Sequence, residues 1–447
     1  MAYRKGGTPF EQRVQIWELA QAGHTDAQIA QALGLGRAVV RKWRRRAKHQ
    51  GRAGLSVRQG RPPRGPLSQS PAHQADAVLR LRAGHPGWGP LTLRCELGKL
   101  PESQGLARPS RSRIAAFLKA HGQPRSYERH APLHVPAGPP APAAHAEWEM
   151  DAQGVQVVAG VGRVVVINIG DPYSRLLTDS LGCLHVTKAT VADYQLALRR
   201  AFVRFGCPQG LSLDHDTSFH EASSASPYPT RLHLWLLALG VTVRFIGIRQ
   251  PTQHGFIEHE HQIMSHQALD GQQFASPAQV QPQLDQRRDF LNAVYPNRAM
   301  GQQAPLQANP SAGYSGRSYS PEREPDLLDP QRVYIYLAQH RWFRRVSSKG
   351  QFELGTYRYG LGAAWANQMV EIHFDPATVE LVCQSQSGQP PKRLPGQGLT
   401  RADWMGELQP DRLPTYQLAF PWSPPVCRMG LLLEEGSGTT FRDNAPT

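Results

Sequence analysis

The pattern of apolar and polar positions near the N-terminus predicts three short helices. Apolar residues recur at helical spacing as far as Gly23, where the first helix should end. Thr25 is placed to cap a second short helix, and Gly34 begins the tight turn that follows it. A third helix carries Trp43 on its apolar face and many cations elsewhere. This order predicts a helix-turn-helix unit over residues 8–50.

A second helical unit is predicted over residues 66–122. Ser70 and Pro71 open its first helix, and Pro109 and Ser110 precede its last one. The following residues, 123–146, are rich in proline, alanine and histidine and have little periodicity. We therefore expect an extended linker there.

From residue 147 the pattern changes to β-branched runs that alternate with amphipathic helices. The expected strands cover residues 155–158, 162–169, 176–184, 211–213 and 241–246. Helices are expected after the third strand, after the fourth and after the fifth. Three strands, helix, strand, helix, strand, helix is the order of a ribonuclease-H-like fold, which we expect over residues 147–310.

The C-terminal third contains further alternating segments. Strands are expected at residues 333–336, 344–346, 351–354, 370–374 and 379–382, with turns at Gly350 and Asp375-Pro376. Five short strands are therefore expected within residues 331–385. Residues 390–447 are rich in proline and glycine, and we expect a partly disordered tail. The expected fold class is thus multidomain α/β.

The charge is concentrated at one end of the chain. Of a formal net charge of +15 over 447 residues, residues 1–125 carry 23 lysines and arginines against 6 acidic residues, or +17, and the remainder sums to −2. This asymmetry predicts binding to a polyanion, and the helix-turn-helix pattern makes double-stranded DNA the expected partner. The candidate DNA-binding residues of the third helix are Arg37, Arg41, Lys42, Arg44, Arg45, Arg46 and Lys48.

The remaining composition narrows the class of protein. The five cysteines are scattered and form no C-x-x-C pair, which favours neither a zinc site nor a disulfide framework. No apolar run reaches the length of about 18 residues that a membrane-spanning helix needs. We expect no membrane association and a cytoplasmic location.

Three carboxylates form the candidate catalytic and metal site. Asp151 lies near the first expected strand, Asp214 directly follows the strand 211–213, and Glu258 lies in the first turns of a helix. Carboxylates brought together from strand ends and a helix suit hard divalent cations such as Mg²⁺. Two such ions can activate an attacking oxygen and stabilise a leaving oxygen on phosphorus.

The order of these motifs resembles the catalytic core of the integrase and transposase superfamily with an Asp-Asp-Glu triad. The matching elements include Trp148…Asp151 on the first strand, Gly206-x-Pro208 before Asp214, and Pro251…Gly255-x-x-Glu258. The turn Pro86-Gly87-Trp88-Gly89 resembles one in the second, often winged, helix-turn-helix of bacterial insertion-sequence transposases. Arg111 and Arg113 near a helix start there could contact phosphates or base edges.

The resemblance implies a DNA transposase or integrase that binds element ends and catalyses metal-dependent phosphodiester hydrolysis and strand transfer. It implies two Mg²⁺ or Mn²⁺ ions on Asp151, Asp214 and Glu258, and a homo-oligomer assembled on DNA. It also implies a C-terminal β-barrel that contacts DNA or a sister subunit, and a bacterial-type, nucleoid-associated location.

Two departures from the family pattern keep a second hypothesis open. The chain has Asp214-His215-Asp216 where the family usually has Asp-Asn-Gly, and His254 where it usually has asparagine. The alternative is a catalytically weakened DNA-binding regulator or accessory protein. The histidines around Glu258 do not form a zinc-protease motif, and we expect them to be solvated or to face phosphates.

Overall fold

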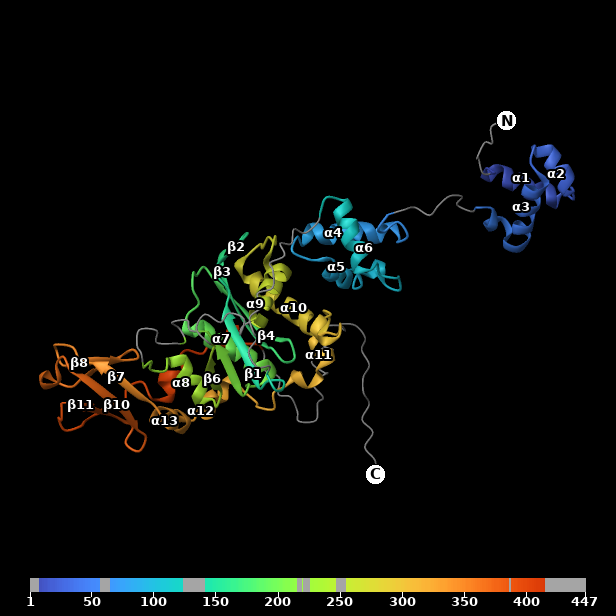
Figure 1. Cartoon of the computed structure of the whole chain (residues 1–447). Helices are drawn as coiled ribbons and strands as arrows, with labels where there is room; N and C mark the ends of the chain where they lie inside the picture. The colour runs from blue at the N-terminus through green and yellow to red at the C-terminus, as the bar shows by residue number, and fades with distance from the viewer. Residues whose placement is uncertain are drawn as a thin grey trace, which may run out of the picture. The chain divides into compact units, whose positions relative to one another are not determined.

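The computed structural model describes residues 8–56, 65–123, 141–214, 219, 226–246, 255–385 and 387–414 (Figure 1). The chain divides into two compact units, residues 1–72 and residues 73–447. Each unit has its own hydrophobic core.

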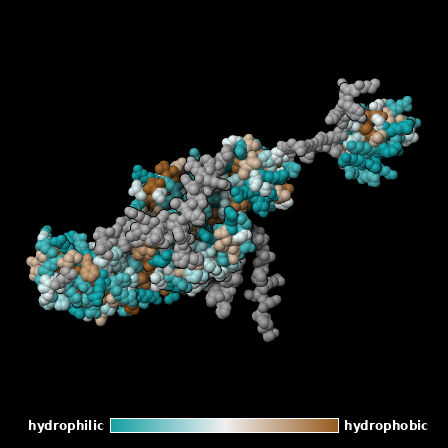
Figure 2. Space-filling view, viewed as in Figure 1, coloured by the Kyte–Doolittle hydropathy of each residue, from teal (hydrophilic) through white to brown (hydrophobic). Residues whose placement is uncertain are grey.

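The first unit is built from three helices, α1 (Phe10–Gln21), α2 (Asp26–Leu33) and α3 (Arg37–Gln50), and ends in a 3₁₀ turn. The expected capping of α2 is confirmed, because the Thr25 hydroxyl accepts from the Gln28 backbone N–H and the Gln28 side chain accepts in return. Gly34 adopts the left-handed conformation (φ 62°) that the tight turn requires. The buried core residues include Ile16, Ile29, Val40, Trp43 and Leu55. Figure 2 shows that most of the visible surface of this unit is hydrophilic.

The second unit begins with a group of three helices, α4 (Ala72–Gly84), α5 (Pro90–Leu97) and α6 (Arg111–Ala120). The turn between α4 and α5 contacts the π-helical turn 265–269, which follows α9 (Gly255–Met264), and Arg287 of α10 (Val280–Ala293). Trp88 is buried there, and its indole N–H donates to the Gln267 carbonyl at 3.0 Å. The Arg287 guanidinium covers the Trp88 ring at 4.6 Å and donates to Glu96 of α5. These helices are therefore packed onto the helical layer of the core.

A mixed sheet forms the centre of this unit. Its strands are β1 (Glu147–Ala152), β2 (Gln156–Val158), β3 (Gly162–Asp171), β4 (Leu176–Leu184), β5 (Gly210–Leu213) and β6 (Thr242–Phe245). β3 pairs antiparallel with β1, β2 and β4, whereas β5 lies between β1 and β6 in parallel. With α7 (Val191–Phe205) before β5 and α8 (Arg231–Ala238) before β6, the expected order of strands and helices is present. The first strand, Glu147–Ala152, contains Trp148 and Asp151 as the resemblance implied, and the β-branched run at residues 155–158 falls in the second strand.

The two faces of the sheet belong to different cores. Alternate residues of a strand point to opposite faces, and Val165, Ile167 and Ile169 of β3 pack with α7 and α8. Their neighbours Val164 and Val166 pack with α9 and α10. Trp148 and Met150 of β1 and Leu211 and Leu213 of β5 belong to the first core. The intervening residues of β1 and β5 therefore face α9.

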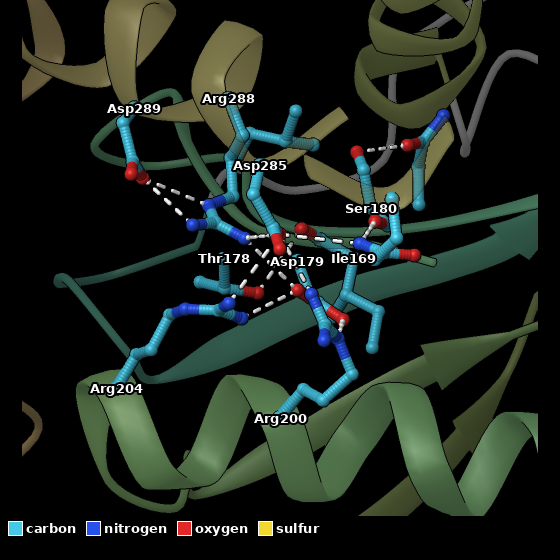
Figure 3. A network of polar contacts seen from close by, with 12 residues as sticks. Ile169, Thr178, Asp179, Ser180, Arg200, Arg204, Asp285, Arg288 and Asp289 are labelled. Atoms are coloured by element: carbon cyan, nitrogen blue, oxygen red, sulfur yellow. Dashed lines mark hydrogen bonds and ion pairs between the residues drawn. The ribbon is translucent and has the colours of Figure 1, made fainter. Parts of the chain in front are cut away.

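A buried ionic network joins α7, α10 and β4 (Figure 3). Two carboxylates, Asp179 and Asp285, lie among three guanidinium groups, and Asp179 is fully buried. Figure 3 shows Arg200 and Arg204 reaching from α7 and Arg288 from α10 toward the same point. Every one of the three arginines contacts both carboxylates, at 2.6–3.3 Å. The network links two helices to the sheet by charge-assisted hydrogen bonds.

The expected strand at residues 333–336 is wrong, because this segment lies in the helix α13 (Pro330–Ala338). The Asp329 carboxylate accepts from the Gln331 backbone N–H, and Pro330 occupies the first helical position. Val333 and Leu337 are buried at a spacing of four residues, which is the period of a helix. Two short helices, α11 (Pro305–Ala308) and α12 (Glu324–Leu327), precede it.

The expected β-barrel is also wrong for the residues that the structure describes, whose C-terminal strands form two open sheets. One sheet has the order β12 (Lys392–Pro395), β11 (Glu380–Ser385), β10 (Met369–Asp375) and β7 (Arg341–Arg345), and the other is the hairpin of β8 (Gln351–Leu354) and β9 (Tyr357–Gly360). Residues 333–336 are part of a helix, and the six described C-terminal strands are divided between a four-stranded sheet and a hairpin. The side chains Trp342, Phe352 and Phe374 join the core of α7 and α8 instead. A strand and the helix α14 (Arg401–Met405) also occupy the start of the segment that we expected to be a disordered tail.

Candidate functional site

The basic helix α3 presents most of its cations to solvent. Its apolar side buries Val40, Trp43 and Ala47 and leaves five cations exposed, of which Arg41 lies 3.7 Å from the Asp26 carboxylate: Arg37, Arg41, Lys42, Arg45 and Lys48. Arg44 is partly engaged by Asp26 of α2 at 2.8 Å. Arg46 is half-buried, and its guanidinium lies 5.9 Å from the centre of the Trp43 ring. An exposed basic helix after a short helix and a glycine turn is suited to contact DNA.

Arg111 and Arg113 lie in the first turn of α6 and are exposed. The Ser110 hydroxyl caps this helix by accepting from the Arg113 backbone N–H at 3.3 Å. The turn between α4 and α5 that contains Trp88, called the tryptophan turn below, packs against the core. The part of this helical group that is available for a ligand is therefore α6.

The first two candidate carboxylates lie at the ends of neighbouring strands. In the parallel pair of β1 and β5, Glu147 is opposite Gly210 and Glu149 is opposite Ser212. Continuing this register places Asp151 opposite Asp214, which directly follows β5. Adjacent strands are about 4.8 Å apart, and both positions fall on the α9 face of the sheet. Strand pairing therefore brings the two aspartate positions together.

Glu258 lies in the first turn of α9, over the same face of the sheet. Desolvation raises the pKa of Glu258, the nearby Asp151 carboxylate raises this pKa further, and His261 lowers it. Glu258 is thus in electrostatic reach of Asp151. In the part of the chain that the structure describes, no three histidine, cysteine or acidic side chains are close enough to hold a metal ion. Residues 215–218 and 247–254, including His215, Asp216 and His254, lie outside the described residues.

His261 is buried and contacts Asp151, so our expectation of solvated histidines is wrong at this position. Its Nε2 lies 3.2 Å from Asp151 Oδ2, and its Nδ1 lies 2.7 Å from the side-chain nitrogen of Asn168 on β3. The Asn168 carbonyl oxygen accepts in turn from the Ser180 hydroxyl of β4 at 2.5 Å. His266 pairs with Asp270, whereas His259 is exposed.

Glu149 is a further acidic residue of the site that sequence reasoning missed. It is buried on β1 two residues before Asp151, and its carboxylate accepts from the Ile257 backbone N–H at 3.1 Å. Burial raises the pKa of Glu149 to about 7, against the opposing effect of this hydrogen bond. The alternation of strand positions was the available signal, because Glu149 and Asp151 must share a face.

Glu260, two positions after Glu258 on α9, lies in the protein interior. It is buried, and burial raises its pKa to about 8, with a smaller lowering by Arg175. At neutral pH the Glu260 carboxyl group is therefore mostly uncharged.

The three candidate carboxylates, two from strand ends and one from a helix, are suitable ligands for a hard divalent cation. Asp151, Asp214 and Glu258 offer only oxygen ligands, which Mg²⁺ and Mn²⁺ prefer over the nitrogen and sulfur ligands typical of zinc. The surrounding hydrogen bonds from Ala152 and His261 to Asp151 resemble the outer contacts that orient carboxylate ligands.

Together, these features define a protein with an N-terminal helix-turn-helix domain and an α/β core whose mixed sheet carries aspartates at the ends of adjacent strands. Residues 12–63 match the family of helix-turn-helix domains, which makes this a DNA-binding unit. None of the described helices has the length and apolar character needed to span a bilayer.

Two solved structures are similar to longer parts of the chain. The catalytic core domain of BIV integrase is 16% identical, over 37% of this chain and 93% of that chain, with a TM-score of 0.26. A chain of the simian T-cell lymphotropic virus intasome, solved with the PP2A regulatory subunit B56 gamma, is 12% identical, over 72% of this chain and 96% of that chain, with a TM-score of 0.31. TM-scores this low do not establish a shared fold.

Proposed function

We propose that this protein is a DNA transposase or integrase of the Asp-Asp-Glu type. The observation that carries the proposal is the register of β1 and β5, which pairs the positions of Asp151 and Asp214 on the face covered by the helix of Glu258. The strand and helix order of a ribonuclease-H-like core supports it. So does the helix-turn-helix unit, whose exposed cations would hold the DNA that such a site acts on.

Asp151, Asp214 and Glu258 would hold two Mg²⁺ or Mn²⁺ ions. In such sites the bound ions supply activation of an attacking oxygen and stabilisation of charge on the leaving oxygen. The task of the protein is to place the carboxylates and the DNA. Water would serve as the nucleophile for hydrolysis at an element end, and the freed 3′-OH would then attack a target phosphate.

The same proposal extends to the partners of the chain. Cations of α3 would bind the terminal repeats, and Arg111 and Arg113 of α6 would add phosphate contacts from the second unit. Strand transfer joins two ends to one target, so a homo-oligomer assembled on double-stranded DNA would be the active form. A DNA-associated location in a bacterial-type cytoplasm fits this function.

The test is a strand-transfer assay with the purified full chain. A donor DNA with the repeats that flank the coding sequence is incubated with a supercoiled target in Mg²⁺ or Mn²⁺. Asp214→Asn and Glu258→Gln should each lower joining by orders of magnitude while end binding stays intact. Asp216→Asn and Glu260→Gln are the matched controls, and each should have a mild effect. The reverse ranking of the four variants would refute the assignment of the triad.

A DNA-binding regulator with a weakened core is the second candidate, and the departure at Asp214-His215-Asp216 favours it. The same assay separates the two functions. Tight, selective binding of the repeats without metal-dependent joining would support the regulator, and full joining in EDTA would exclude the metal mechanism.

A further inference from the structure

Two hydrogen bonds connect strand β1 to helix α9 beside the candidate carboxylates. One runs from the Ile257 backbone N–H to Glu149, and the other joins His261 to Asp151. On the strand the two acidic residues are two positions apart, an advance of roughly 6.6 Å. On the helix the two partners are four positions apart, an advance of about 6 Å. Because these two repeats match, the bonds can form side by side without distorting either element.

The hydrogen-bond partners of His261 also determine its orientation. The Asn168 amide N–H₂ donates to Nδ1, since the Asn168 carbonyl oxygen already accepts from Ser180. Nε2 therefore holds the ring proton and donates it to Asp151 Oδ2. The second oxygen of Asp151 accepts from the Ala152 backbone N–H at 2.8 Å. Asn168 and Ser180 are both fully buried, so the chain of donors is held by three elements of the core.

We propose that Glu149 and His261 are positioning residues, which fasten the first two turns of α9 to β1 and thereby fix Asp151 and Glu258 relative to each other for metal binding. This inference rests on the proposed function, because it assigns the supports of the same site. Glu258 directly follows Ile257 and lies within one helical turn of His261, so its backbone is held on both sides. Neither positioning residue needs to contact the metal ion or the DNA.

The two hydrogen bonds are important because they link the two elements from which Glu258 and Asp151 come. Glu258 comes from the helix α9. Asp151 comes from the sheet. A carboxylate pair from two separate elements binds an ion well only when the elements are held together beforehand. The two hydrogen bonds supply such a link at the point where it acts on both carboxylates.

The test is the affinity of the full chain for Mn²⁺, measured by titration with MnCl₂ and detection of free Mn²⁺ by electron paramagnetic resonance. His261→Ala should weaken Mn²⁺ binding about 10- to 100-fold, the usual effect of removing an outer partner of a ligand. His261→Gln keeps an N–H donor that can reach Asp151 and should recover much of the loss. His259→Ala changes an exposed residue of the same helix and should leave the affinity unchanged. If His261→Ala does not fold, His261→Asn replaces it, because its amide is too short to reach Asp151.

Glu149 is tested by a second measurement that does not depend on metal. Glu149→Leu removes the acceptor for the Ile257 N–H, and hydrogen exchange in the peptide covering residues 255–264 should become faster. Glu149→Gln keeps an acceptor oxygen and should stay close to the wild type in both exchange and Mn²⁺ affinity. Equal exchange in the Leu variant and the wild type would overturn the role of Glu149.

The outcomes separate this inference from the proposed function. Asp151→Asn and Glu258→Gln should both weaken Mn²⁺ binding, and if neither does, the metal site itself is wrong. If they do while His261→Ala and Glu149→Leu bind Mn²⁺ like the wild type, the site stands and the positioning role is refuted.

Discussion

The buried ionic network on β4 leads to a quantitative prediction about stability. Asp179 is fully buried and accepts from three guanidinium groups, which are themselves 2–18% exposed. Replacing it with asparagine would leave these three cations with one shared carboxylate, Asp285. The side chain keeps its size, so the substitution changes the charge balance with little change in packing.

The expected cost of Asp179→Asn is about 3–5 kcal/mol in the free energy of unfolding, because removing one partner leaves buried charges uncompensated. Asp289→Asn is the matched control. Asp289 contacts Arg288 of the same network at 2.7 Å, but its side chain is 54% exposed. An exposed ion pair is worth about 0–1 kcal/mol, so this control should be nearly neutral.

Equilibrium urea denaturation of the full chain measures both variants. Tryptophan fluorescence is a suitable signal, because Trp148 and Trp235 are fully buried in the core on the α7 face of the sheet. The midpoint of Asp179→Asn should fall with an unchanged slope, whereas Asp289→Asn should overlay the wild type. A loss for Asp179→Asn no larger than that for Asp289→Asn would refute the view that this network holds α7 and α10 to the sheet.

Three further predictions concern other parts of the chain. Trp88→Ala should cost about 3–5 kcal/mol, as large core truncations do, and hydrogen exchange should show faster opening of α4 to α6 while β3 stays protected. Burial raises the pKa of Glu260 from 4.5 to about 8, so the stability of its neutral form is fully present below pH 4.5 and is lost as the pH rises toward 8. Glu260→Gln should therefore be more stable than the wild type in urea at pH 8 and should lose this advantage at pH 4.5, and equal differences at both values would contradict the pKa. Deleting residues 1–72 removes 14 basic and 3 acidic residues, a formal +11, and should lower the slope of DNA affinity against salt concentration in a filter-binding assay.

Local signals in the sequence predicted the parts of the fold that depend on neighbouring residues. The cap at Thr25 and the turn at Gly34 are decided within a few residues, and both are present. The central strands were predictable because long β-branched runs have few alternatives. The segment 333–336 misled the prediction, since Val-Tyr-Ile-Tyr has a high strand propensity. The start signal Asp329-Pro330 and burial against α8 determined the helix instead.

The residues that hold the candidate carboxylates in place could not be predicted from local sequence patterns. His261 meets Asp151 across 110 residues and Asn168 across 93, and no spacing rule connects such positions. Glu149 could have been paired with Asp151 by strand alternation, but its partner Ile257 could not have been named. The motif order suggested which carboxylates to consider, and tertiary structure alone could show what holds them.

The packing of the tryptophan turn has a consequence for protein engineering. Residues 1–72 form a separate compact unit with a core of their own, which suggests exchanging them for a different helix-turn-helix domain. The helices α4 to α6 cannot be exchanged in this way. Gly87 lies so close to the His266 carbonyl that a β-carbon there would be 2.2 Å from it. Removal of the turn would take away the indole N–H that donates to the Gln267 carbonyl and the ring that Arg287 covers. In chimeric proteins designed for altered sequence preference, the second helical group should therefore be kept together with its core.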